Sequence, residues 1–191
     1  MIQLQSNPSS LSQQKAVFFD RDGVINQLIE KDREITSPKN ISEFKFLPNV
    51  IFSIEKVQNL GYKTFIVTNQ PGILEGKQTW EELNEITKML LDILKVDGIY
   101  NSVDKNSATY KPNNGMIKYF INQFNLHTNK SYIIGDRWKD IVPGYNSGIN
   151  TIYVGEQWTN PPEPYADIVP DHICSDILEA CNYIAEIDNE R

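Results

Sequence analysis

Residues 15–23 have the sequence Lys-Ala-Val-Phe-Phe-Asp-Arg-Asp-Gly, an apolar run that ends abruptly in three charged residues and a glycine. A short continuous apolar run bounded by turn residues is typical of a strand buried on both faces. The pattern therefore predicts a buried strand that ends at Phe19, with Asp20 and Asp22 in the polar turn at its carboxyl end.

Apolar runs of this kind recur along the chain, and segments with helical apolar spacing lie between them. We expect further strands over residues 62–67, 98–103, 131–134 and 151–154. The helical segments are 48–60, 79–94, a helix that opens at Asn113 or Asn114, a short stretch before Gly148, and a last helix from about Ser175. Strands that alternate with helices are typical of a parallel sheet with right-handed crossovers. The sequence therefore predicts an α/β fold with a Rossmann-like, doubly wound parallel sheet.

Polar side chains follow three of the predicted strands directly, and a lysine opens the helix after another. They are Asp20 and Asp22, Thr68 and Asn69, Lys111, and Asp136 and Asp140. An isolated aspartate at a strand end is most often a turn or helix-cap residue. In doubly wound sheets, however, ligands bind beyond the carboxyl ends of the strands, so these groups are expected to converge. Four groups of compatible chemistry at one edge favour a site over four separate turns.

The converging residues are of the types that bind a cation and a phosphoryl group. Clustered carboxylates repel one another, and Mg²⁺ relieves the repulsion because it prefers carboxylate, carbonyl and phosphate oxygens. The absence of His and Cys from the set disfavours zinc and copper. A lysine and a hydroxyl suit phosphoryl oxygens, and an aspartate can itself attack phosphorus to form an aspartyl phosphate. A second aspartate can protonate the leaving oxygen when its environment separates the two pKa values. These residues predict Mg²⁺-dependent phosphoryl transfer.

Four stretches, in order along the chain, resemble the motifs of the haloacid dehalogenase-like (HAD) phosphatases. They are Phe18–Asn26 (FFDRDGVIN), Val67–Gly72 (VTNQPG), Lys111-Pro112 and Gly135–Asp140 (GDRWKD), and the resemblance covers about residues 15–155.

This resemblance implies a role for each matching residue. Asp20 would be the nucleophile and a metal ligand, and Asp22 the general acid/base, binding the metal through its backbone carbonyl. Asp136 would complete the Mg²⁺ site, and Asp140 would contact the residues around the metal without binding it directly. Thr68 and Asn69 would hold the phosphoryl oxygens, and Lys111 would neutralise their charge.

Within the superfamily, residues 20–26 and 67–73 are most similar to the D-glycero-D-manno-heptose 1,7-bisphosphate phosphatases and to the related histidinol-phosphate phosphatases. This similarity implies a sugar (bis)phosphate as substrate. Those enzymes usually carry a Cys/His zinc loop, whereas no Cys or His lies between Tyr100 and Lys111 here. They also tend to carry an arginine where this chain has Tyr110. The short loop also resembles the polynucleotide 3′-phosphatases, and a non-catalytic phosphate-binding module on the same fold is a third hypothesis.

Neither the segment after the first motif nor the one between the second and third is long enough for a cap domain. We therefore expect a capless, open site that is covered by a small flap within residues 26–46. Substrate choice then depends on a few loop side chains, among which we expect Arg21, Tyr110, Arg137 and residues of the 26–46 segment.

The charge balance disfavours polyanionic partners. The 191 residues include 18 Lys and Arg against 25 Asp and Glu, a net charge of −7, whereas binding to nucleic acid or an anionic membrane usually needs a basic face. We expect a small phosphorylated molecule as partner. No apolar stretch approaches the roughly 20 residues of a membrane span, and the start lacks a signal-peptide pattern. We thus expect a cytoplasmic monomer or small homo-oligomer, with a disordered tail over 1–14 and one domain over 15–191.

Overall fold

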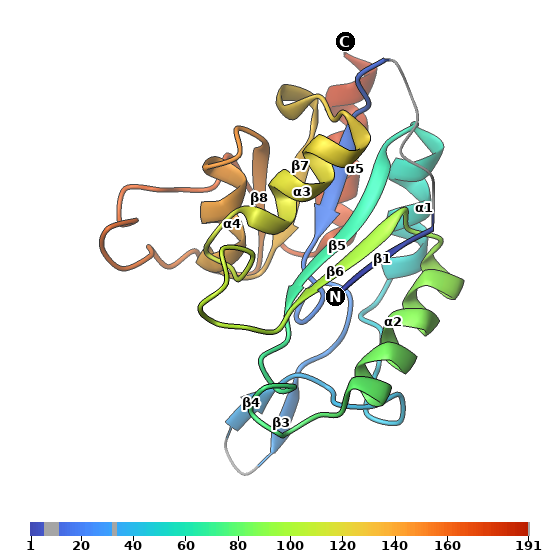
Figure 1. The fold of residues 1–191 in the computed structure, drawn as a ribbon. Helices are drawn as coiled ribbons and strands as arrows, with labels where there is room; N and C mark the ends of the chain where they lie inside the picture. Colours follow the sequence, from blue (N-terminus) through green and yellow to red (C-terminus); the bar gives the residue numbers. More distant parts are fainter. Residues whose placement is uncertain (6–11, 32–33, 191) are drawn as a thin grey trace.

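The computed structural model describes residues 1–5, 12–31 and 34–190. The strands of its main sheet are β1 (Ile2–Leu4), β2 (Ala16–Phe19), β5 (Lys63–Asn69), β6 (Gly98–Ser102), β7 (Tyr132–Gly135), β8 (Asn150–Val154) and β9 (His172–Cys174). In space their order is β1-β6-β5-β2-β7-β8-β9 (Figure 1). β1 runs antiparallel to β6, and the other neighbouring pairs are parallel. β2 is the central strand, so the 20–23 turn leaves the sheet at its middle.

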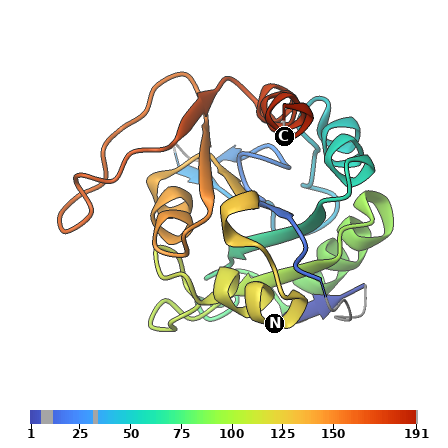
Figure 2. The same ribbon diagram turned by 90° about the horizontal axis from the view of Figure 1, so that it is seen from above.

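Helices cover both faces of this sheet (Figure 2). α1 (Val50–Asn59), α2 (Trp80–Leu94) and α5 (Ile177–Asn189) lie on one face, and α3 (Gly115–Phe124) and α4 (Trp138–Tyr145) on the other. β2 alternates between the two layers: Val17 and Phe19 pack toward α1, α2 and α5, whereas Ala16 and Phe18 pack toward α3. This alternation is the period of two that a strand imposes on its side chains.

Local hydrogen bonds fix where two of the helices begin. Thr79 Oγ1 accepts from the Glu82 backbone N–H at 3.2 Å, and Glu82 Oε2 accepts from the Thr79 N–H at 2.8 Å. This reciprocal pair is a capping box, which satisfies two N–H groups that the first turn would otherwise leave unpaired. Asp176 caps α5 in a simpler way, by accepting from the Glu179 N–H at 2.9 Å.

The five predicted strands and the doubly wound α/β architecture are confirmed, with ends that differ by one or two residues. The strands β1 and β9 were not predicted, because three residues are too few to show a period. The expected disordered tail is wrong at its start: Ile2 pairs with Tyr100 and Leu4 with Gly98, so β1 extends the sheet. Residues 6–11 of that tail lie outside the described part of the chain.

A small hairpin supplies the expected flap. β3 (Ile29–Lys31) and β4 (Glu34–Thr36) pair with each other and lie beyond the end of the main sheet (Figure 1). The base of the 26–46 segment is fixed to the central turn by a bridge between Asn26 and Phe46 and by the Leu47 N–H, which donates to the Ile25 carbonyl at 2.9 Å. Within the described residues, no helix is long and apolar enough to cross a membrane.

Candidate active site

The carboxyl ends of β2, β5 and β7 bring the predicted site residues to one cavity of about 170 Å³. Its lining includes Asp20, Asp22, Thr68, Asn69, Tyr110, Lys111, Arg137 and Asp140. Ser37 from the flap, Pro71 and Lys139 also line it, and these three were not singled out from the sequence. Asp136 faces an adjoining hollow of about 310 Å³ that shares Arg137 and Lys139 with the first. The convergence predicted from the strand ends is therefore present.

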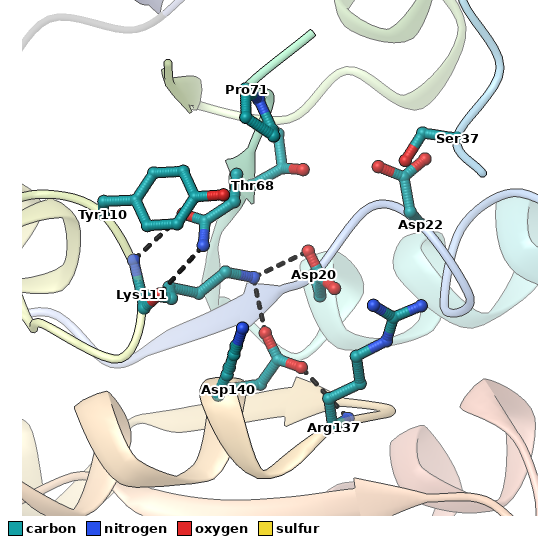
Figure 3. A pocket seen from close by; sticks show the side chains of 11 residues that line it. Asp20, Asp22, Ser37, Thr68, Pro71, Tyr110, Lys111, Arg137 and Asp140 are labelled. Carbon is teal, nitrogen blue, oxygen red and sulfur yellow. Dashed lines mark hydrogen bonds and ion pairs between the residues drawn. The ribbon is translucent and has the colours of Figure 1, made fainter. Parts of the chain in front are cut away.

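Lys111 is the buried cation at the centre of the site, 4% exposed. Its ammonium donates to Asp20 Oδ1 at 2.7 Å, to the Val67 carbonyl at 3.0 Å and to Asp140 Oδ1 (Figure 3). An ammonium has three N–H donors, so all of them have protein acceptors. Burial alone would lower the pKa of Lys111, but the charges of Asp140 and Asp20 outweigh it and raise the pKa above its ordinary value. The lysine therefore stays charged between two carboxylates.

Asp20 is fixed through one of its two oxygens. Oδ1 accepts from the Arg21 backbone N–H at 2.7 Å and from Lys111, and no described residue donates to Oδ2. Burial raises the pKa of Asp20, as does the charge of Asp140, and the charge of Lys111 offsets only part of the rise. The result is an oriented carboxylate with one oxygen left for other chemistry.

Asp136 is the least satisfied carboxylate in the site. Its Oδ1 is buried and has no hydrogen-bond partner in the described structure. Its Oδ2 lies 3.7 Å from Arg137 Nε, a long ion pair with an exposed side chain. Burial, together with the charge of Asp140, raises the pKa of Asp136. A buried carboxylate oxygen without a donor is costly in a protein unless a cation or a proton compensates its charge.

Two glycines make room for these carboxylates. A Cβ on Gly23 would lie 2.2 Å from Asp136 Oδ2, and one on Gly135 would lie 2.1 Å from Asp140 Cβ. Gly23 also has a φ of +92°, which favours glycine. Because Gly23 has no side chain, the backbone of the turn after β2 packs directly against the Asp136 carboxylate.

The geometry fits a hard divalent cation. Carboxylate oxygens of Asp20, Asp136 and Asp140 lie within 4.8 Å of one another, and the bare oxygen of Asp136 is a ligand type that Mg²⁺ prefers. Asp140, however, has both oxygens engaged, one by Lys111 and the other by the Arg137 backbone N–H at 3.1 Å. Asp20 and Asp136 thus each have an oxygen that no described residue donates to at hydrogen-bond distance, whereas Asp140 holds Lys111 and the Arg137 backbone in place beside them.

The Asp22 carboxylate belongs to a separate buried network. Arg21 donates to it from Nε at 3.1 Å and from Nη2 at 2.9 and 3.0 Å, Asn26 Nδ2 at 3.0 Å and Gln70 Nε2 at 2.7 Å. Burial alone would raise the pKa of Asp22, but the Arg21 charge and these hydrogen bonds outweigh it and hold the pKa below its usual range. Arg21 was expected among the loop side chains that select the substrate, but it is 1% exposed and pairs with Asp22, so its guanidinium belongs to this buried network.

Thr68 and Asn69 have different surroundings, although they are neighbours in sequence. Asn69 contacts the backbone of Lys111 with both ends of its amide: Nδ2 donates to the Lys111 carbonyl at 3.0 Å, and Oδ1 accepts from its N–H at 2.9 Å. Its side chain thus positions the lysine, and it also lines the cavity, so the expected phosphate contact stays a prediction. The Thr68 hydroxyl accepts from Gln70 Nε2 at 2.9 Å and lines the cavity.

The mouth of the site carries Tyr110 and two exposed cations, Arg137 and Lys139. Burial raises the pKa of Tyr110, so its phenol stays neutral. Lys139 makes no ion pair with a described residue, and its ammonium lies 5.5 Å from the Trp138 ring centroid. Its position two residues after Arg137, at the start of α4, was the sequence signal that could have identified it.

Sequence reasoning did not identify Asn26 and Gln70, the two amides that reach Asp22. Both are buried, at 0% and 3% exposed. Gln70 follows Thr68-Asn69 directly, but a glutamine after a strand is equally typical of an exposed turn. The Gln70 side chain points inward to Asp22, and the end of β5 and the turn after β2 that carry these two residues are brought together only by folding.

Clustered carboxylates beside a buried lysine, at the carboxyl edge of a doubly wound sheet, fit a phosphatase of the HAD type. The chain belongs to the polynucleotide kinase 3 phosphatase family, which matches residues 15–183.

Individual relatives agree with this class. The chain is 30% identical over 150 residues to the D-glycero-alpha-D-manno-heptose-1,7-bisphosphate 7-phosphatase of Photorhabdus laumondii, covering 71% of this chain and 79% of that protein. It is 31% identical over 144 residues to the D-glycero-beta-D-manno-heptose-1,7-bisphosphate 7-phosphatase of Helicobacter pylori J99, with coverage of 71% and 79%. Its fold is similar to that of the D,D-heptose 1,7-bisphosphate phosphatase of B. bronchiseptica complexed with magnesium and phosphate, with a TM-score of 0.71, 21% identity and coverage of 91% and 99%.

Proposed function

We propose that this phosphatase is Mg²⁺-dependent, that it hydrolyses a phosphate monoester of a small metabolite, and that the substrate is a sugar bisphosphate such as heptose 1,7-bisphosphate. The observation that carries the proposal is the Asp20 carboxylate, fixed through Oδ1 by Lys111 and a backbone N–H while Oδ2 has no donor among the described residues. A carboxylate oriented in this way is suited to attack phosphorus.

The first half of the reaction forms an aspartyl phosphate. Asp20 Oδ2 forms a bond to phosphorus, the bond from phosphorus to the leaving oxygen breaks, and Asp22 gives that oxygen a proton. The Arg21 network favours the ionised form of Asp22, and the approach of a phosphate dianion opposes this by charge repulsion, which favours uptake of the proton. The Thr68 hydroxyl donates to a phosphoryl oxygen, and Lys111 compensates the charge on Asp20 and the phosphoryl group.

The second half returns the enzyme to its starting state. Asp22 takes a proton from a water molecule as the water oxygen attacks phosphorus. The bond between phosphorus and Asp20 Oδ2 breaks, and inorganic phosphate leaves. Ionised Asp22, which the Arg21 network stabilises, is the form that this step needs.

We expect Asp20, Asp136 and the backbone carbonyl of Asp22 to hold Mg²⁺. The unpartnered Oδ1 of Asp136 and the turn at Gly23 support this assignment, as does the magnesium bound to the B. bronchiseptica relative. When bound, Mg²⁺ neutralises charge on the phosphoryl oxygens. Asp140 keeps Lys111 and the Arg137 backbone in place beside this site.

The rim of the site supports a substrate with a second anionic group. Lys111 is already shared between two carboxylates, whereas Arg137 and Lys139 are exposed at the shared edge of the cavity and the adjoining hollow. We expect these two cations to contact the leaving portion of a bisphosphate. They supply the positive charge that Tyr110 does not.

The family description favours a polynucleotide 3′-phosphatase as a second candidate. A single terminal phosphate needs few contacts, so the open site does not prevent it. The net charge of −7 gives a nucleic acid little electrostatic attraction.

The test is phosphate release from a panel that contains sugar monophosphates, sugar bisphosphates, histidinol phosphate, nucleotides and a 3′-phosphorylated oligonucleotide. We expect turnover of one sugar bisphosphate with Mg²⁺, none with EDTA, and a loss of at least about three orders of magnitude in Asp20→Asn. Asp92→Asn, an exposed change on α2, is the matched control. Preference for the oligonucleotide, with activity that falls steeply as salt rises, would instead identify an end phosphatase.

The rim cations have their own test within that panel. Lys139→Met should raise KM for the bisphosphate about 5- to 20-fold and leave KM for the matching monophosphate nearly unchanged, as expected for one lost charged contact. Lys118→Met, exposed on α3, is the control. An equal effect on both substrates would show that Lys139 does not bind the second phosphate.

A further inference from the structure

Gln70 contacts both the proposed acid/base, Asp22, and the proposed phosphate-binding residue, Thr68. It is 3% exposed, and its backbone N–H donates to the Ser102 carbonyl at 2.7 Å, which fixes it at the end of β5. Its Nε2 donates both to Asp22 Oδ2 at 2.7 Å and to Thr68 Oγ1 at 2.9 Å. A single amide nitrogen thus contacts the proposed acid/base and the proposed phosphate-binding hydroxyl.

The orientation of the Gln70 amide follows from the hydrogen bonds that Asp22 accepts from Arg21. Arg21 donates to both oxygens of Asp22 from a buried guanidinium, so both of these oxygens act as hydrogen-bond acceptors in this structure. Gln70 must therefore present its NH₂ group to Asp22, because its carbonyl oxygen would be repelled there. The second N–H of the same nitrogen then faces Thr68.

This arrangement also determines which way the Thr68 hydroxyl donates. A hydroxyl has one proton and two acceptor lone pairs, and an N–H from Gln70 occupies a lone pair of Thr68 Oγ1. The Thr68 proton is thereby directed away from Gln70. Thr68 is 1% exposed and lines the cavity, and no described residue accepts its proton. The remaining direction is the cavity, where a phosphoryl oxygen would accept it.

We propose that Gln70 is a positioning residue that orients the Thr68 hydroxyl as a hydrogen-bond donor to the phosphoryl group, with its own orientation set by the Arg21–Asp22 pair. This inference rests on the proposed function and adds a cause to it. The strength with which Thr68 binds the phosphoryl group then depends on a chain of four contacts. Arg21 contacts Asp22, Asp22 contacts Gln70, Gln70 contacts Thr68, and Thr68 contacts the phosphate. Gln70 itself does not touch the substrate.

Gln70→Leu removes both donors and keeps a side chain of similar size. Gln70→Glu keeps the shape but replaces the NH₂ with an oxygen that can only accept, so the Thr68 proton turns toward residue 70. We expect the affinity for inorganic phosphate to fall about 10-fold in Gln70→Leu, and further in Gln70→Glu, as for a hydrogen bond to a charged group. Gln78→Leu is the matched control: Gln78 is also buried, at 7% exposed, but donates to the Lys39 carbonyl outside this network.

A double-mutant cycle with Thr68 separates positioning from a merely structural role. The affinity is measured in Mg²⁺ as the inhibition constant of inorganic phosphate against hydrolysis of p-nitrophenyl phosphate, with melting temperatures recorded for every variant. Thr68→Val removes the hydroxyl, and in that background Gln70→Leu should cost nothing more. In a Thr68→Ser background, which keeps the hydroxyl, the 10-fold loss should return.

Two results would overturn the assignment. One is multiplication of the losses to about 100-fold in the Gln70→Leu/Thr68→Val double variant, which would mean that the two residues act independently. The other is unchanged phosphate affinity in both folded Gln70 variants. A wild-type protein without Mg²⁺-dependent turnover would overturn the proposed function itself, a different outcome from an active enzyme whose cycle is additive.

Discussion

Asp20 and Asp22 are only two residues apart in the first motif, but the negative charges of their carboxylates are compensated in opposite ways. Asp22 receives hydrogen bonds from Arg21, Asn26 and Gln70, and its pKa is held low. The second group consists of Asp20, Asp136 and Asp140. The ammonium of Lys111 contacts Asp20 and Asp140, whereas one buried oxygen of Asp136 has no donor in the described structure. We call these the Asp22 network and the Lys111 cluster.

The difference between the two groups lies in their charge. The Asp22 network pairs one charge of each sign, so its charge is balanced without a ligand, although Arg21 Nη1 and Asn26 Oδ1 are buried there without a hydrogen-bond partner in the described structure. The Lys111 cluster has three carboxylates and one ammonium, and buried like charges raise the pKa values of Asp20 and Asp136. A cation therefore changes the Lys111 cluster much more than the Asp22 network.

The largest expected effect comes from Lys111→Met, which removes the ammonium and leaves Asp20 and Asp140 buried without compensation. Breaking a buried ion pair in this way costs about 3–5 kcal/mol of unfolding free energy, and turnover should become undetectable. Mg²⁺ should restore part of the stability by neutralising Asp20, but not the activity. Urea unfolding with and without Mg²⁺, together with phosphate release, measures both effects.

Lys118→Met, at an exposed position on α3, controls for the loss of a lysine and should be close to neutral. A Lys111→Met protein as stable as the wild type would show that protonation of the carboxylates, and not the lysine, balances this cluster.

Gly23→Ala tests the contact between the turn and Asp136. Alanine at a positive φ costs about 1 kcal/mol, and here its Cβ would also lie 2.2 Å from Asp136 Oδ2. We expect a loss of Mg²⁺-dependent activity of about 100-fold, because the carboxylate must move away from Asp20.

Gly76→Ala is the matched control, since Gly76 also has a positive φ, +67°, but no atom within 4 Å of a Cβ. It should show the stability loss alone. Equal activity in the two variants would mean that Asp136 needs no close approach to the turn.

The sequence was sufficient to predict the Lys111 cluster, but not the Asp22 network. Asp20, Asp136 and Asp140 follow strands that are adjacent in the sheet, so strand order alone brings their Cα atoms together. Asp22 and Gln70 also follow adjacent strands, but their contact depends on two side chains that turn inward, and Arg21 has the sequence signature of an exposed turn residue.

Asn69 shows the same limit. Its place beside Thr68 led to the expectation of a phosphate contact, which stays a prediction, but the sequence did not show that its amide also contacts the Lys111 backbone through both its nitrogen and its oxygen. Strands β1 and β9 were missed for another reason: each has three residues, and pairing with β6 or β8, not a local pattern, makes them strands.

The pH dependence of stability should have opposite signs for the two groups. Asp20 and Asp136 have folded-state pKa values above the ordinary 3.8, so the native state binds more protons than the unfolded state at neutral pH, and stability falls as pH rises. In EDTA we expect a loss of about 1–2 kcal/mol between about pH 5 and about pH 8. Asp22 has a lowered pKa, so its contribution is present throughout that window and is lost only in stronger acid.

Chemical unfolding at several pH values, in EDTA and in saturating Mg²⁺, tests this sign. Mg²⁺ should flatten the slope and add about 1–3 kcal/mol through binding to the native state. Asp136→Asn should reduce both the slope in EDTA and the gain from Mg²⁺. Stability in EDTA that rises with pH over this window would contradict the raised pKa values.

The smallest expected effect comes from Asn26→Ala, which removes one donor from the Asp22 network. Asp22 keeps the two-nitrogen contact with Arg21 and the bond from Gln70, so we expect a loss of about 1 kcal/mol in stability and an unchanged gain from Mg²⁺. Asn101→Ala, a buried asparagine that donates to Thr87 Oγ1 at 3.1 Å away from the site, should cost about the same without changing kcat. Three side chains donate to Asp22, whereas Lys111 is the one side chain among the described residues that donates to Asp20 and Asp140. Removing one side-chain donor should therefore be tolerated in the Asp22 network and not in the Lys111 cluster. A loss in Asn26→Ala as large as that in Lys111→Met would show that Asp22 depends on each of its donors, and that the two groups are balanced alike.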